Sequence, residues 1–493
     1  MTEIATFQTP TYTHAHHLSL KSLTWVTLGI TAVMGGLFFA VGFPPAFDTF
    51  YEKMYFHSIG IGIAAMLAYL MLETFRLEDY EPPIDFPIRY RAFLAVVFGA
   101  IGGLFALSPS IWTGWPDVGM LFFVAAFVLV ADVGGAMLVE LIVLPRKKAG
   151  VYHGDSRNII DYVWRLVPLT AADRAPYRGL SSAYWLAVIS LASACVAALI
   201  GFINLWVRAF GPSIFGGFYG LFGYNQQGIL DATLDPHSHM IALAIFGGIV
   251  AVAVLRFRAL ESDSRVRRLV ASAGTWIALI GVIGTTLILG AVAFLNYAPP
   301  TLFASPDGVN GMAGDDLVMS IVFLGAVVVA VAVLADRAFW RNGLRLTIVG
   351  TWLGMVAITV LEGFYIEMNQ TQFAGPKTAN DAAFSAAHPM TGIFLMIGLS
   401  LALLLLDFAG VTGRARQLTI AVGATGLVAA VAGTTLWTFV DPSNTGPLYW
   451  LYIGGIAIAY LAILAAAVTV RSTLTGNLEQ SKGKPPVVAP TTA

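Results

Sequence analysis

Residues 54–74 read MYFHSIGIGIAAMLAYLMLET, a mostly apolar stretch that contains one imidazole, His57, and one carboxylate, Glu73. A helix crosses the hydrocarbon core of a bilayer with roughly 20 mostly apolar residues, so this stretch predicts a membrane span. An ionisable side chain within a span is costly and usually faces the interior of the helix bundle. His57 therefore marks the face of this helix that we expect to point inward.

The rest of the chain repeats this pattern. Of 493 residues, 57% are hydrophobic and 11% are charged, whereas a soluble domain carries about 25% charged residues. This composition excludes a soluble globule and predicts an all-α integral membrane protein with twelve transmembrane helices. The twelve predicted spans are 23–43, 54–74, 92–109, 117–144, 183–206, 238–256, 269–295, 317–335, 346–367, 389–409, 418–439 and 448–470.

The distribution of basic residues predicts the orientation. Cytoplasmic loops are enriched in Lys and Arg, and all but Lys53, Arg208 and Lys377 of the 27 Lys and Arg residues fall on the same side as the N-terminus. We therefore expect both termini to be cytoplasmic, with 1–22 as an N-terminal segment and 472–493 as a disordered tail. The expected location is the prokaryotic inner (plasma) membrane, which the chain crosses many times.

A weak internal repeat divides the membrane domain, residues 23–471, into three units. The second, sixth and tenth spans begin with His57-Ser-Ile-Gly, His239-Met-Ile-Ala and His388-Pro-Met-Thr-Gly. Four spans separate each histidine from the next, which gives four-helix units at about 23–144, 183–335 and 346–470. All three histidines are thereby expected at the same depth on the outer side.

These histidines are candidate metal ligands, because imidazole nitrogen binds haem iron, copper and zinc, and small residues such as Gly62 and Gly392 leave room for a flat macrocycle. Interfacial hydrogen bonding and close helix packing are the alternatives. His237 and His239 lie about 200° apart on a helix and cannot both point at one interior site unless the helix starts between them. Pro236 predicts a helix start that keeps His237 at the rim, which favours His239. The other histidines, in polar segments, are expected to be solvated: His14, His16, His17 and His153.

This pattern resembles the main subunit of haem-copper oxidases and nitric oxide reductases. The resemblance covers nearly the whole chain in topology and few residues in sequence. It implies that His57 and His388 ligate a low-spin haem, most simply of b type, and that His239 ligates a second metal, copper or iron. It also implies respiratory electron transfer or diatomic-gas (O2 or NO) chemistry. The implied partners are membrane lipid, small accessory subunits and an external electron donor such as a cytochrome, a cupredoxin or a quinol, with no nucleic acid.

Two departures from the family change this expectation. The seventh span, residues 271–296, lacks the paired histidines of the family, and Ser385-Ala-Ala-His388 replaces the His-x-His of its tenth span. The sequence therefore predicts a divergent member with one haem, weak binding of a second metal at His239 with Asp235, and absent or very slow oxygen reduction. If the protein is an enzyme, the resemblance implies a haem-dependent oxidoreductase. Cys195 is the sole cysteine, so the chain alone offers no thiolate metal site.

Three carboxylates lie within apolar spans: Asp132, Glu140 and Glu362. Asp132 and Glu140 are eight residues apart, about 80° around a helix, which predicts a proton path toward the interior. The alternative is that each carboxylate is protonated or bonded locally. A proton- or cation-coupled transporter built from internal repeats is the rival function, in which His57, His239 and His388 would join Asp132 in an ion path.

The topology predicts the outcome of cysteine labelling in intact cells. Single cysteines placed in 207–236 or 368–387 should react with a membrane-impermeant reagent, because these segments are expected outside. Cysteines placed in 145–181 should react only after lysis. Labelling of 145–181 in intact cells would contradict the predicted topology.

Overall fold

A computed structural model of the chain describes residues 14–40, 50–75, 82–106, 116–152, 166–168, 170–302, 312–362, 365, 379–443 and 446–482. The helices are α1 (His14–Ala40), α2 (Phe50–Phe75), α3 (Pro82–Ala106), α4 (Pro116–Lys148), α6 (Ala171–Arg174), α7 (Ser182–Phe210), α8 (Ser213–Gly220), α9 (Gln226–Arg256), α10 (Arg265–Leu295), α11 (Gly314–Leu334), α12 (Gly343–Met355), α14 (Ala379–His388), α15 (Met396–Phe408), α16 (Gly413–Phe439) and α17 (Pro447–Lys482). Two π-helical segments, Val356–Glu362 and Pro389–Leu395, extend α12 and join α14 to α15. The described strands, Thr301–Leu302 and Met312–Ala313, form one short antiparallel pair.

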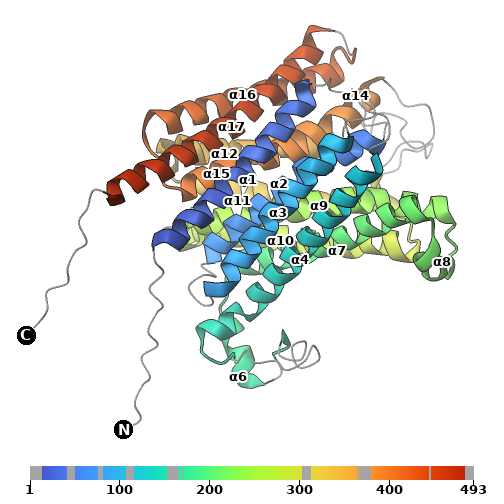
Figure 1. Ribbon diagram of the computed structural model, residues 1–493, viewed down its shortest axis with the longest axis horizontal. Helices are drawn as coiled ribbons and strands as arrows, with labels where there is room; N and C mark the ends of the chain where they lie inside the picture. The colour runs from blue at the N-terminus through green and yellow to red at the C-terminus, as the bar shows by residue number, and fades with distance from the viewer. Residues whose placement is uncertain are drawn as a thin grey trace, which may run out of the picture.

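The prediction of an all-α membrane protein is confirmed. Within the described residues, eleven helices are long and apolar enough to cross a membrane, and α1 contributes a shorter apolar stretch, Ser22–Phe38. The helices form one bundle in which α1 begins and α17 ends at the end that carries α6, while α8 and α14 lie at the opposite end (Figure 1). These two ends are called the α6 end and the α8 end below.

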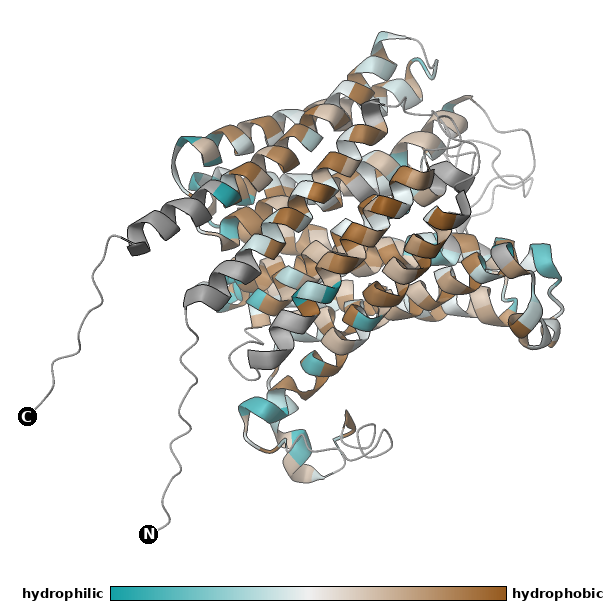
Figure 2. Cartoon of the chain, in the orientation of Figure 1, coloured by the Kyte–Doolittle hydropathy of each residue, from teal (hydrophilic) through white to brown (hydrophobic). Residues whose placement is uncertain are grey.

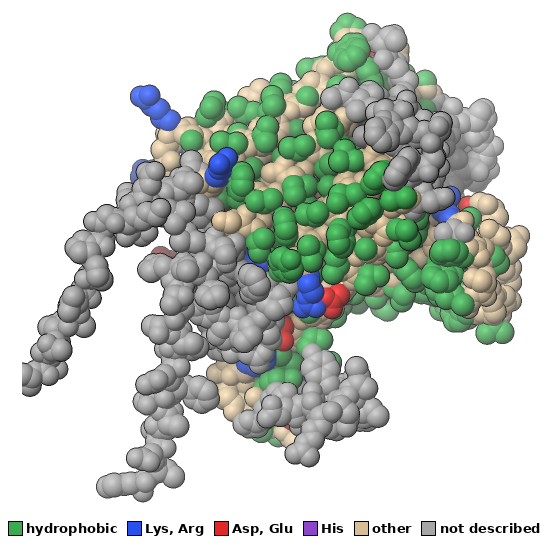
Figure 3. All heavy atoms as spheres, viewed as in Figure 1, with side chains coloured by type: hydrophobic (Ala, Val, Ile, Leu, Met, Phe, Trp, Pro, Cys, Tyr) green, Lys and Arg blue, Asp and Glu red, His purple; other side chains and the backbone are tan. Residues whose placement is uncertain are grey.

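The surface of the bundle suits a lipid environment. Hydrophobic residues run along the helices, whereas hydrophilic residues gather at loops and helix ends (Figure 2). One face is covered by hydrophobic side chains over most of its area, with Lys and Arg mostly at its edges (Figure 3). Large side chains such as Leu121, Leu287 and Val428 are 71%, 68% and 68% exposed. Such exposure over a wide surface is expected where lipid replaces water.

The three helices predicted to carry histidines lie at the centre of the bundle. In the most apolar 18-residue window of each span, 78% of the residues are buried in α2, 78% in α9 and 94% in the helix over Ala382–Phe408. No other described span exceeds 56%. α2 packs against α9 and α15, and α1 packs against α17, so the first and last parts of the chain close the bundle.

Small residues allow the outer helices to pack closely. Along the seam between α16 and α17, a Cβ atom added at Gly455 would lie 2.3 Å from the main-chain nitrogen of Ala430, and one added at Gly433 would lie 2.4 Å from that of Tyr452. Gly454, the neighbour of Gly455, has no atom within 4 Å of such a Cβ. Close backbone approach at small residues is the usual means of helix association in lipid, where burial of apolar surface gives little driving force.

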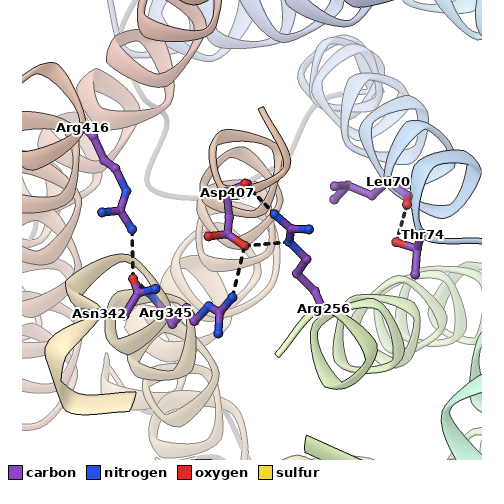
Figure 4. Close-up of polar contacts among 7 residues, drawn as sticks. All are labelled: Leu70, Thr74, Arg256, Asn342, Arg345, Asp407 and Arg416. Carbon is purple, nitrogen blue, oxygen red and sulfur yellow. Dashed lines mark hydrogen bonds and ion pairs between the residues drawn. The ribbon is translucent and has the colours of Figure 1, made fainter. Parts of the chain in front are cut away.

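Ion pairs tie the central helices together at the α6 end. Arg256, the last residue of α9, donates to a carboxylate oxygen and to the main-chain carbonyl of Asp407 on α15, both at 2.8 Å. Arg345 on α12 approaches the same carboxylate at 3.8 Å. Both guanidinium groups point at Asp407, while Arg416 donates to Asn342 nearby (Figure 4). The Asp407 side chain is 10% exposed, so removing it would leave two arginines facing each other in a poorly hydrated place.

The glycine seam can be tested with two adjacent substitutions. Gly455→Ala should lower the free energy of unfolding by about 1–3 kcal/mol, because its methyl group overlaps the main chain of α16. Gly454→Ala is the matched control and should leave the stability unchanged or slightly raised. Thermal unfolding in detergent, followed by size-exclusion chromatography, measures both. Equal melting temperatures for the two variants would contradict the packing.

The ion cluster makes a second prediction. Asp407→Ala should destabilise the protein by about 1–3 kcal/mol, because it removes the charge-assisted hydrogen bond from Arg256 and leaves two half-buried arginines facing each other. Glu261→Gln is the control, since the Arg258–Glu261 pair is 79% and 69% exposed and such pairs contribute about 0–1 kcal/mol. Chemical denaturation in mixed micelles compares them. A loss for Asp407→Ala no larger than for Glu261→Gln would show that the cluster does not stabilise the bundle.

Candidate functional site

The four membrane histidines lie on the central helices, but deeper within them than the sequence predicted. α9 begins at Gln226 and contains Pro236, so the predicted helix start at Pro236 is wrong. The tenth span likewise begins before His388, which is the last residue of α14. The apolar patterns begin near these histidines, whereas the helices extend further because polar residues also form helix. Asn225, for example, caps α9 by accepting a hydrogen bond from the main-chain nitrogen of Gly228.

His57 on α2 faces His237 on α9. Their ring centroids are 6.0 Å apart and their planes differ by 8°. Phe127 of α4 lies edge-on to His57, with centroids 5.6 Å apart. Side chains from three helices that are far apart in the sequence thus meet at one point near the α8 end.

The His237 ring is held in place by α7. Its Nδ1 lies 2.8 Å from the carbonyl oxygen of Ala197. The ring also fills the space beside Gly201, where an added Cβ would lie 2.4 Å from the Cε1 atom of His237. Gly201 is the single glycine of α7. An isolated glycine in a helix often marks a close contact, so this residue was the signal in the sequence from which the contact could have been found.

His388 has a similar local arrangement. Its Nδ1 lies 3.1 Å from the carbonyl oxygen of Phe384, and its ring stacks on the Phe384 ring with centroids 4.7 Å apart. A π-helical segment starts at the next residue, Pro389, which has no N–H to continue the α-helical ladder. π-helical turns occur frequently at functional sites. His239 of α9 lies in the neighbourhood of His388.

These contacts fix which ring nitrogen carries the proton. A main-chain carbonyl oxygen only accepts hydrogen bonds, so Nδ1 must be protonated and donate in both His237 and His388. Nε2 is then the basic nitrogen with the lone pair. Metal-binding histidines nearly always have this arrangement, in which the second nitrogen donates to a carbonyl or carboxylate and orients the ring. With the lone pair on Nε2, each of these two imidazoles has the donor atom that haem iron or copper binds.

The helical positions of His237 and His239 agree with the sequence expectation that they face different sites. His237 contacts α2 and α7, whereas His239 lies near His388 of α14. His237 is not at the rim, because α9 continues for several turns before it. The contacts thus pair His57 with His237, while the resemblance pairs His57 with His388.

The glycines expected to make room for a macrocycle are in close contact with neighbouring helices. A Cβ at Gly62 would lie 2.0 Å from the Thr31 hydroxyl of α1, and a Cβ at Gly392 would lie 2.8 Å from the Thr359 methyl. Both positions therefore serve helix packing, the alternative that the sequence left open for small residues.

The carboxylates expected in a proton path have basic partners of their own. Asp132 forms an ion pair with Arg91 of α3, and its side chain is 45% exposed. Glu140 pairs with Lys147 at 2.8 Å. The side chains of Glu362 and Asp235 lie outside the described residues, as do those of His14, His16, His17 and His153. The proton path and the second-metal pair of His239 with Asp235 stay predictions.

The seventh span, α10, uses its hydroxyl groups to bind α7. Thr275 and Ser182 share a hydrogen bond, and Thr286 donates to Ser193 at 2.7 Å. Among the described residues, no group of three or more His, Cys, Asp and Glu side chains is arranged to hold a metal ion. The structure thus presents imidazoles in pairs within the part of the chain that it describes.

An apolar cavity of about 80 Å³ lies one to two helical turns below the His57–His237 pair. Ala64 and Ile241 line it, about two turns after His57 and about one turn after His237, and Ala194 lines it about one turn before Ala197 on α7, which runs in the opposite direction. Cys195 also lines it, on α7. Its apolar walls offer water few hydrogen-bond partners. The sequence did not predict it, because it arises where small residues of separate helices face one another.

The short helix α8 packs over the ends of α7, α9 and α10. Tyr219 is buried against Ile203 and Val207 of α7 and Ile229 of α9, and burial raises the pKa of its phenol to about 12. Tyr224 donates to the carbonyl of Val292 on α10 at 2.8 Å. This segment of the predicted outer loop 207–236 is thereby attached to the bundle near the histidines.

Comparison with known proteins gives no match: neither a protein family, nor a curated protein, nor a solved structure is significantly similar to this chain.

Proposed function

We propose that this protein is a membrane haem protein of respiratory electron transfer or diatomic-gas chemistry, built on a scaffold like the main subunit of haem-copper oxidases. In this proposal the twelve spans form three four-helix units, both termini are cytoplasmic, and the α8 end is the outer end. The protein belongs in the prokaryotic inner membrane beside accessory subunits and an electron donor.

The position of the histidines supports this proposal most. α2, α9 and the helix over Ala382–Phe408 are the three most buried spans, and each carries histidine near the α8 end. A buried imidazole is costly unless it has a partner. The central helices carry four partly buried imidazoles in two pairs, His57 with His237 and His239 near His388, although a bundle needs none for its stability.

The described residues have clear roles in such a site. The carbonyls of Ala197 and Phe384 orient His237 and His388 and keep their Nε2 atoms basic. A haem iron held by two imidazoles supplies one-electron transfer. Phe127 and the surrounding apolar helices exclude water. The exclusion of water limits competing reactions and strengthens electrostatic interactions in the site. The apolar cavity below the histidines could store a diatomic gas.

A transporter is the second candidate, and the π-helical segments favour it. Val356–Glu362 and Pro389–Leu395 lie in adjacent spans and pack against each other. Interrupted helices that face one another are typical of substrate sites in transporters. In that function the histidines would bind protons or cations rather than a haem.

The absorption spectrum distinguishes the two functions. Protein purified from a haem-competent host should show the reduced-minus-oxidised spectrum of a low-spin haem. His57→Ala should remove or strongly alter that spectrum, because His57 belongs to the ligand pair implied by the resemblance and to the pair seen in the contacts. His153→Ala, in a polar segment, is the control and should change nothing. A colourless wild-type protein with no bound haem would contradict the proposed function.

A further inference from the structure

The segment around α8 is apolar although it connects two spans. Residues 210–224 read FGPSIFGGFYGLFGY and contain no charged side chain. α8 lies at the tip of the bundle, beside the ends of α7 and α9 (Figure 1). A helix that meets water on its outer side normally carries polar side chains there. The composition of α8 therefore suits an apolar environment on its outer side.

Two faces of α8 carry large apolar side chains. The first packs on the bundle, where Tyr219 is buried and Phe215 lies against the same cluster. Residues three and four apart share a face of a helix, and Leu221 keeps helical backbone angles directly after α8. Ile214, Phe218 and Leu221 therefore form a second face, on which they are 66%, 45% and 81% exposed.

The third face of α8 has only small residues. It consists of Ser213, Gly217 and Gly220, which are all exposed. A helix that lies in the plane of a membrane surface turns its apolar side chains toward the acyl chains and its remaining side toward water. The faces of α8 match this arrangement. The third face then stays within reach of labelling reagents that are dissolved in water.

The apolar surface of α8 continues the exposed apolar surface of α7. Leu199 and Phe210 on α7 are 51% and 65% exposed. The Trp206 ring lies between those of Phe202 and Phe210, with centroids 5.9 Å and 4.8 Å apart, and edge-on to Phe215 of α8 at 6.4 Å. A line of aromatic rings thus leads from the span onto α8. Aromatic side chains gather in this way where a span leaves the hydrocarbon core.

The length of α9 places α8 at the level of the lipid head groups. α9 has 31 residues and is about 46 Å long, whereas the hydrocarbon core is about 30 Å thick. Arg256 ends α9 in the ion cluster at the α6 end. The opposite end of α9, on which α8 packs, therefore reaches the head groups of the other leaflet even at the usual tilts of a span. Arg208, which donates to Asn204 in the last turns of α7, suits the same depth.

We propose that α8 is an interfacial helix, whose side chains Ile214, Phe218 and Leu221 insert between the head groups and acyl chains of the leaflet at the α8 end. The partner is the phospholipid surface itself. Because Tyr219 packs on both α7 and α9, this attachment also fixes the ends of these two helices. α7 in turn carries the carbonyl that accepts the hydrogen bond of His237. The inference holds for a haem protein and for a transporter alike.

Spin labelling of the full-length protein tests this proposal with two matched pairs of positions. Cys195→Ala first removes the sole cysteine, so that each variant carries one thiol. Leu221→Cys and Ile214→Cys place the label on the exposed apolar face. Gly220→Cys and Gly217→Cys are the controls on the third face, where an added Cβ has no atom within 4 Å. Each variant is placed in nanodiscs of phosphatidylcholine, and unchanged elution on size-exclusion chromatography shows that it folds.

The measurement compares collisions of each label with oxygen and with a water-soluble nickel chelate. The ratio of oxygen to nickel accessibility should be several-fold higher for the labels that replace Ile214 and Leu221 than for the two controls, because oxygen concentrates in acyl chains and the chelate stays in water. A preference for nickel at all four positions would overturn the proposal, since α8 would then stand clear of the membrane. Labels at Ile214 and Leu221 that are shielded from both reagents would also overturn it, because protein rather than lipid would then cover this face.

Discussion

The structure depends on how buried polar groups are satisfied within lipid. Helices in a bilayer gain little from burying apolar surface against one another, so they associate through close packing and through internal polar contacts. The polar contacts of the three most buried described spans are therefore especially important for the bundle. These spans are α2, α9 and the helix over Ala382–Phe408. At the α6 end, the ion pair between Asp407 and Arg256 joins two of these spans. Near the α8 end, His237 lies against the carbonyl of Ala197 and faces the ring of His57.

These contacts explain how the centre of the bundle is packed while its surface stays apolar. Glycines such as Gly433 and Gly455 bring outer helices into backbone contact, which leaves their larger side chains for the lipid. Gly201 does the same on the inner side, but the space it leaves is filled by an imidazole. One type of residue thus serves packing at the periphery and side-chain placement at the centre.

The sequence predicted the membrane class and most spans correctly, because an apolar run of about 20 residues has few alternatives. It also predicted that His237 and His239 face different neighbours, which follows from helical geometry. It misplaced the starts of α9 and of the tenth span, since helix continues through polar residues beyond the apolar run. The partner of His57 was beyond prediction, because it depends on the rotation of α9 against α2 and on the notch in α7. The ion pair between Asp132 and Arg91 depends likewise on two helices lying side by side.

The central claim is that histidines of the central helices near the α8 end hold a haem. A cryo-electron microscopy map of the purified full-length protein, at a resolution that shows side chains, tests it most directly. The account predicts the flat density of a haem against the ring of His57, with the Ala197 carbonyl hydrogen-bonded to Nδ1 of His237. Well-ordered histidine rings with no cofactor density beside any of them would contradict it.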